Sequence, residues 1–90
     1  MKVKTALKYN GATIITIREG QKEDYKVLCQ IHYGVKPTEE WTEIDNGRWI
    51  NTWGVVTYDS RIRVGEEILN RNVDFFTATD TQHITIYVKW

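Results

Sequence analysis

The chain has 90 residues, of which 41% are hydrophobic and 12% aromatic, and its twelve basic residues balance twelve acidic ones. This length allows one hydrophobic core, so we expect one compact domain over residues 1–90. Zero net charge gives no long-range field for phosphates, which argues against duplex DNA as a partner. The single cysteine permits no internal disulfide, and no apolar run suits a signal peptide or a membrane span. We therefore expect a cytoplasmic protein that does not enter a membrane.

Two β-rich runs begin the chain, Lys2–Tyr9 and Ala12–Arg18, on either side of the dipeptide Asn10-Gly11. Asn-Gly between such runs is the strongest short-range signal for a β-hairpin. A two-residue turn would pair Leu7 with Ile14, whereas a three-residue bulged loop, with its glycine at positive φ, gathers more apolar side chains on one face. We favour the bulged loop, which brings together Val3, Leu7, Ile15 and Ile17.

A third strand is predicted from the alternation of residues that follows the polar loop at residues 19–24. The core-facing set of this strand is Tyr25, Val27, Cys29, Ile31 and Tyr33. A small cysteine within an apolar row is typically buried and structural. We therefore expect Cys29 to be an inert thiol in the core.

Residues 38–44 allow two predictions. Thr38 followed by Glu39 and Glu40 has the pattern of a helix N-cap with acids in the first turn. If residues 38–44 are extended instead, Asp45-Asn46-Gly47 becomes a second hairpin loop that leads into a strand over Arg48–Tyr58. The sequence leaves this choice open.

The C-terminal third predicts one helix and one hairpin. The helix lies within Ser60–Asn72, with Glu66 and Glu67 near its start and Ile68 and Leu69 facing inward. The hairpin joins residues 73–79 to residues 83–90, and the second of these runs alternates as a half-buried strand does. The whole pattern predicts a β-rich α+β fold, a mostly antiparallel sheet of about five or six strands with one or two short helices on one face.

No catalytic, cofactor-binding or metal site is expected. A Cys–His nucleophile pair needs a thiol beside a base, but Cys29 and His32 are three residues apart on a predicted strand and face opposite ways. His83 would approach Cys29 only through a strand pairing that the sequence does not reveal. Two histidines and one cysteine, without metal-ligand spacing, are too few for a zinc site.

Four tryptophans in so short a chain are the most unusual feature of the sequence. Trp49 and Trp53 lie four apart on a predicted strand and share a face, with Asn51 between them. Trp41 joins that face if residues 38–44 are extended. These side chains either line the core or form a binding surface, since tryptophan is enriched in both places. We expect at least one of the three to be exposed, because only one face of the strand need line the core.

The function that we favour is a non-enzymatic interaction or regulatory module. It would bind another protein, or a second copy in a homodimer, through a sheet edge or through an aromatic patch of Trp41, Trp49, Asn51 and Trp53. The alternative is a binder of single-stranded nucleic acid that stacks bases on exposed tryptophans and tyrosines, with Lys2, Lys4 and Lys8 on one strand face, or a binder of a carbohydrate or cationic ligand on the tryptophan and tyrosine face. A small enzyme is a third alternative, and it requires Cys29, His32 or His83 in a pocket.

Overall fold

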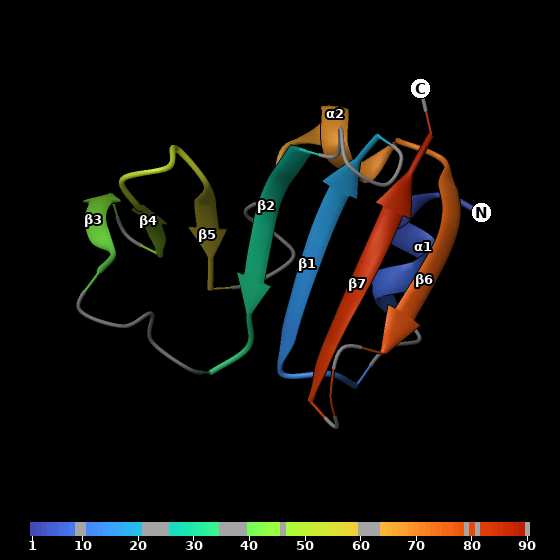
Figure 1. Ribbon diagram of the computed structural model, residues 1–90, viewed down its shortest axis with the longest axis horizontal. Coiled ribbons are helices and arrows are strands. Elements are labelled where there is room, and N and C mark those ends of the chain that lie inside the picture. Colours follow the sequence, from blue (N-terminus) through green and yellow to red (C-terminus); the bar gives the residue numbers. More distant parts are fainter. Residues whose placement is uncertain are drawn as a thin grey trace.

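The computed structural model describes residues 1–8, 11–20, 26–34, 40–45, 47–59, 64–78, 80 and 82–89. The strands are β1 (Ile14–Glu19), β2 (Lys26–His32), β3 (Thr42–Asp45), β4 (Arg48–Ile50), β5 (Val56–Tyr58), β6 (Val73–Ala78) and β7 (His83–Val88). Within the described residues they form one mixed, mostly antiparallel sheet in the order β3-β4-β5-β2-β1-β7-β6 (Figure 1). The helices are α1 (Val3–Lys8) and α2 (Glu66–Leu69). The predicted β-rich α+β class is confirmed, with seven strands where about five or six were expected.

The centre of the sheet joins segments that are far apart in the chain. β1 pairs antiparallel with β2 and parallel with β7, in a register that runs from Ile14 opposite His83 to Glu19 opposite Val88. β2 also pairs parallel with β5. Parallel neighbours cannot be joined by a tight turn, so these pairings depend on longer connections.

The N-terminal segment is a helix, which corrects the predicted first strand. α1 buries Val3, Ala6 and Leu7, and these positions have the spacing of one helix face. Val3 and Leu7 also fit the two-residue period of a strand, which is why alternation alone gave the wrong element. The predicted first hairpin therefore lacks its first strand. Gly11 has no positive φ, and residues 9–10 lie outside the described residues.

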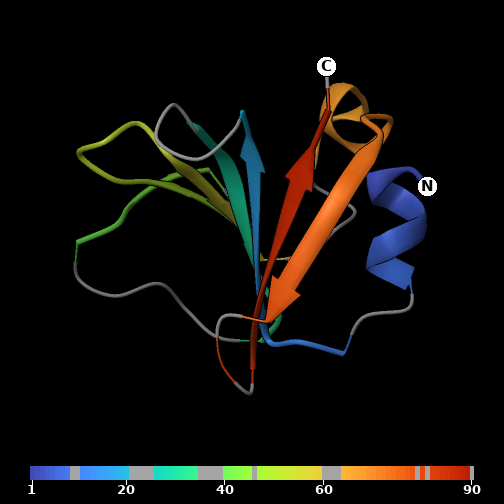
Figure 2. The same ribbon diagram turned by 45° about the vertical axis from the view of Figure 1, so that its right-hand side comes forward.

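Both helices cover the same face of the sheet and lie behind it in Figure 1, and Figure 2 shows them on one side. α2 falls within the predicted segment, although residues 60–63 are outside the described part. Ile68 and Leu69 pack against the core as predicted. The buried core consists of Val3, Ala6, Leu7, Ile15, Ile17, Cys29, Ile31, Val64, Ile86 and Val88.

Two short strands replace the single strand predicted over residues 48–58. β3 and β4 form the predicted second hairpin, in which Asp45 pairs with Arg48 and Gly47 has a φ of 81°. The extended alternative for residues 38–44 is thus correct from Thr42 onward. After β4 the chain reverses, and β5 returns antiparallel to it. Gly54, with a φ of 81°, takes the left-handed conformation that this reversal uses.

The C-terminal hairpin is confirmed. β6 pairs antiparallel with β7, with one irregularity between Val73 and Phe75. β7 lies inside the sheet beside β1, whereas β6 is its outermost strand. At the other end of the sheet the outermost strand is β3.

The strand register sorts the side chains into two faces, because directly opposed residues on neighbouring strands point the same way. One row across the helix-covered face consists of Ile50, Val56, Cys29, Ile17, Ile86 and Phe76. The neighbouring row on the opposite face consists of Glu43, Trp49, Thr57, Gln30, Thr16, Thr85 and Thr77. We call this second surface the polar face.

Candidate functional site

The four residues predicted for the aromatic patch lie in different local structures. Trp41 precedes β3 and Trp49 lies in β4, and both are partly buried. Asn51 and Trp53 lie in the connection between β4 and β5. Trp53 is 88% exposed, which confirms that at least one of the three tryptophans is at the surface. Because the chain reverses after β4, Trp49 and Trp53 do not share one strand, which corrects the predicted geometry of the patch.

Asn51 fixes the backbone that carries Trp53. Its side-chain Oδ1 accepts hydrogen bonds from the backbone N–H of Trp53 at 2.9 Å and of Val55 at 3.1 Å. The backbone N–H of Gly54 donates to the carbonyl of Asn51 at 3.1 Å. A side chain that bonds to its own downstream backbone is a common way to hold a turn. We call residues 51–55 the Trp53 turn.

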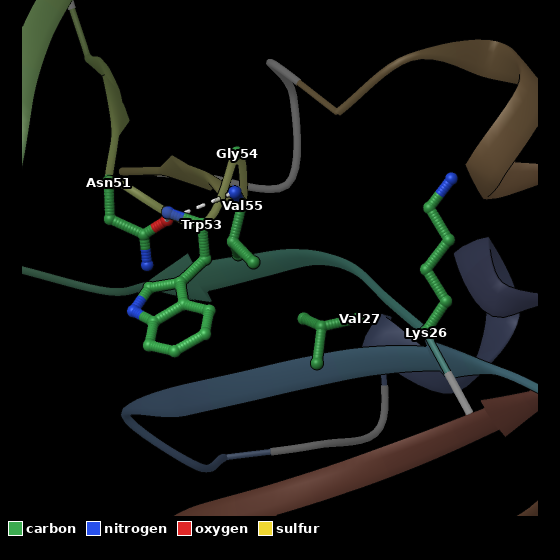
Figure 3. Close-up of a pocket in the computed structure, with 6 residues that line it drawn as sticks. All are labelled: Lys26, Val27, Asn51, Trp53, Gly54 and Val55. Atoms are coloured by element: carbon green, nitrogen blue, oxygen red, sulfur yellow. Dashed lines mark hydrogen bonds between the residues drawn. The ribbon is translucent and has the colours of Figure 1, made fainter. Parts of the chain in front are cut away.

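An open pocket of about 530 Å³ lies between the Trp53 turn and the start of β2 (Figure 3). Its lining residues are Lys26, Val27, Asn51, Trp53, Gly54 and Val55. The indole ring and the two valine side chains supply its apolar surface. The side chain of Lys26 extends at the end away from the indole, whereas the amide of Asn51 lies beside the ring.

The polar side chains around this pocket offer hydrogen-bond donors. Both the Lys26 ammonium and the Trp53 indole N–H are donors only. The Oδ1 atom of Asn51 is already engaged by two backbone N–H groups, so its Nδ2 group remains to bind a ligand. No acidic residue is among the described residues that line the pocket. The pocket therefore complements an apolar group that lies beside an anion or a carbonyl oxygen.

Sequence reasoning found Asn51 and Trp53 but missed Lys26 and Val27. These two residues belong to β2, which pairs in parallel with β5, and β3 and β4 lie between these two strands in the sequence. No local pattern predicts a parallel pairing between such distant segments.

A row of hydrogen bonds joins the central strands on the polar face. Thr16 Oγ1 lies 2.7 Å from Nε2 of His83 and accepts from Nε2 of Gln30 at 3.2 Å. Nε2 of His32 lies 3.3 Å from Oε1 of Gln30. Thr16 and His32 are both buried. Burial lowers the pKa of His32, and the nearby His83 lowers it further.

Two buried polar atoms beside this row have no hydrogen-bond partner among the described residues. They are the Oγ1 atom of Thr57 and the Nδ1 atom of His32. A buried polar atom that has lost its water and gained no partner lowers the stability of the fold. The polar face is therefore only partly satisfied by the residues that build it.

Cys29 lies on the helix-covered face, on the other side of the sheet from His32 and His83. It is fully buried, as the sequence predicts. Burial raises the pKa of its thiol to about 12, so the reactive thiolate is scarce near neutral pH. The strand pairing that the sequence could not reveal brings His83 to Thr16 and leaves it across the sheet from Cys29.

In the part of the chain that the structure describes, no three His, Cys, Asp or Glu side chains gather as metal ligands. No helix of that part is long and apolar enough to cross a membrane. Comparison with protein families, with curated proteins and with solved structures finds no match for this chain. The function must therefore be argued from the residues themselves.

Proposed function

We propose that this protein is a non-enzymatic interaction module that binds another protein through the Trp53 turn and its pocket. The observation that carries the proposal is the 88% exposure of Trp53 on a backbone fixed by Asn51. A large aromatic side chain in water gains much by burial against a partner. A backbone that is already ordered loses little entropy when it binds, which favours this turn as a contact point.

The pocket defines the chemistry of the partner. An apolar side chain of the partner would lie against the indole of Trp53 and against Val27. A carboxylate of the partner would accept a hydrogen bond from Lys26 at one end of the pocket, and a backbone carbonyl would accept one from the Nδ2 group of Asn51 beside the indole. The expected partner therefore presents an apolar residue beside an acidic one on an exposed segment.

The distribution of charge favours a protein partner over single-stranded nucleic acid. A nucleic-acid groove needs several basic residues along the strand beside its stacking aromatics. Glu43 and Asp45 are exposed on β3, in the same arm of the sheet as Trp53. The exposed Lys4 and Lys8 lie on α1, near the opposite end of the sheet (Figure 1). Lys4 and Lys8 thus do not share a surface with Trp53, which has Lys26 as the lysine of its pocket.

The test is a comparison of the wild-type protein with Trp53→Ala and Lys26→Ala. Each protein is immobilised and exposed to an extract of the native host, and the retained proteins are quantified by mass spectrometry with and without nuclease. Ile44→Ala is the matched control, because Ile44 is also an exposed apolar residue, at 47%, on the neighbouring β3. The most enriched protein is then purified and titrated directly against each variant by isothermal titration calorimetry.

We expect Trp53→Ala to weaken the direct binding by at least about tenfold, which corresponds to a typical interface hot spot. Lys26→Ala should weaken it less, and Ile44→Ala should leave it unchanged. A binding constant that Trp53→Ala does not change would refute the proposal. Binding that nuclease abolishes and that oligo(dT) reproduces would assign the turn to nucleic acid instead.

A further inference from the structure

The two outer edges of the sheet differ in charge. β3 is exposed along its whole length and carries Glu43 and Asp45. β6 is exposed from Asp74 onward, and its stretch from Phe75 to Ala78 has no charged residue. Exposed edges of natural sheets usually carry charges or prolines that prevent pairing with another strand. β3 has this protection, and the uncharged stretch of β6 does not.

We propose that β6 pairs antiparallel with β6 of a second copy of this chain, so that two sheets join into one continuous sheet. The apolar side chains at this edge suit such pairing on both faces. Phe75 is 50% exposed and Phe76 is 52% exposed. Phe75 stacks on Tyr87 of the polar face with ring centroids 4.4 Å apart, whereas Phe76 lies opposite Ile86 on the helix-covered face.

The N-terminal residues limit where the second copy can pair. The backbone N–H of Val73 donates to the carbonyl of Met1 at 2.7 Å, and Lys2 forms an antiparallel bridge with Asn72. The beginning of the β6 edge is thus already engaged. Pairing is therefore confined to the stretch from Asp74 to Ala78. Nζ of Lys89 lies 3.8 Å from the carboxylate of Asp74 and offsets its charge.

Symmetry favours a second copy as the occupant of this edge. A twofold axis brings each edge against its own equivalent. At β6 this places uncharged residues together, whereas at β3 it would place Glu43 and Asp45 near their own copies. Pairing of β3 with β6 would set carboxylates against the phenylalanines and would extend without closing. The antiparallel β6 pair avoids both the unfavourable placement of carboxylates and the assembly that does not close.

The size of the contact predicts a weak dimer, because a few residues from each copy bury less surface than a standard interface. Sedimentation velocity of the whole chain, from about 1 µM to about 1 mM, measures its dissociation constant. We expect a reversible monomer–dimer equilibrium within this range. Phe76→Lys should raise the dissociation constant by at least about tenfold, because an edge lysine opposes strand pairing. Ile44→Lys, the same change on the β3 edge, should leave it unchanged.

A second measurement locates the interface without relying on Phe76→Lys, which could also prevent dimerisation by disturbing the fold. Because Cys29 is buried, a spin label on folded Thr77→Cys or Ile44→Cys attaches to the introduced thiol. In the proposed dimer the two labels at position 77 lie within about 20 Å of each other, given the spacing of paired strands. The labels at position 44 should be much farther apart, because β3 is at the other end of the sheet.

Three outcomes would overturn the proposal. The first is a monomer at every concentration. The second is a dimer that Phe76→Lys leaves intact while circular dichroism shows it folded. The third is a short label distance at position 44 instead of position 77. None of these outcomes bears on the Trp53 turn, which lies on the other arm of the sheet, so the two proposals can fail separately.

Discussion

The helix-covered face and the polar face of the sheet share the same strands but bury their side chains for different physical reasons. In β1, Ile15 and Ile17 are fully buried under the helices, and Thr16 between them is buried on the other side. The isoleucines stabilise the fold by removing apolar surface from water. A buried threonine stabilises the fold only if its hydroxyl group has a hydrogen-bond partner. Equal burial on the two faces therefore does not mean an equal contribution to stability.

The helix-covered face should be the most sensitive to substitution. We expect Ile17→Ala to lower the free energy of unfolding by about 2 to 5 kcal/mol, because it leaves a cavity in a closed core. Ile44→Ala is the control, since Ile44 is 47% exposed on β3 and its loss should change stability by less than about 0.5 kcal/mol. Urea denaturation of the two variants measures the difference. Similar losses in both would contradict the assignment of the core to this face.

Two threonines of the polar face should respond in opposite directions to the same substitution. Thr16→Val removes a hydroxyl that bonds to both Gln30 and His83, so we expect a loss of about 1 to 3 kcal/mol. Thr57→Val removes a buried hydroxyl that has no hydrogen-bond partner among the described residues, so we expect a gain of about 1 kcal/mol. The two variants are measured together by urea denaturation. A loss of stability in Thr57→Val would show that its hydroxyl is satisfied in solution.

His32 should make the contribution of the polar face to stability depend on pH, unlike that of the helix-covered face. Its pKa is lowered from 6.5 by burial and by the nearby His83, so the folded protein takes up this proton at lower pH than the unfolded chain. Neutral His32 therefore makes its full contribution to the free energy of unfolding above pH 6.5. This contribution is lost as the pH falls through 6.5 towards the lower pKa of the folded state. We expect the free energy of unfolding to fall over that window.

The matched variant is His32→Asn, which removes the titrating group and keeps a polar side chain. Urea denaturation at a series of pH values should show a shallower pH dependence for His32→Asn than for the wild type. Identical slopes in the two proteins would mean that another group titrates in this window.

The strands that follow one another closely in the chain could be predicted from the sequence. The alternation identified Cys29 and Ile31 of β2 and Ile86 and Val88 of β7 as core positions, and Asp45-Asn46-Gly47 identified a hairpin. Val27, which was also predicted to face the core, is half-buried and lines the pocket instead, and Tyr25 lies outside the described residues. α1 was missed because Val3 and Leu7 fit both the helical and the strand period. The sequence does not reveal the reversal at residues 51–54, because the pattern around Trp53 also fits a regular strand. Asn51 and Gly54 are the residues that make that reversal.

The candidate site could be predicted only in part, because a tryptophan-rich segment is visible in the sequence but its surroundings are not. The exposure of Trp53 follows from its place in a turn. Lys26 and Val27 reach the same pocket through the parallel pairing of β2 with β5, and no periodicity in one segment reveals its partner strand. The row from Thr16 to His32 was missed for the same reason.

The parallel pairing of β1 with β7 also determines when the domain can form on the ribosome. β1 gains its antiparallel neighbour soon after it is made, because β2 follows it closely in the chain. Its other edge has no partner until the segment from His83 to Val88 has been synthesised and has closed a loop over most of the chain. A nascent chain therefore carries the strand of Ile15 and Ile17 with one open edge until residues 83–88 have been made. Such long-range closure slows folding, and until it is complete the unpaired edge of this apolar strand favours aggregation.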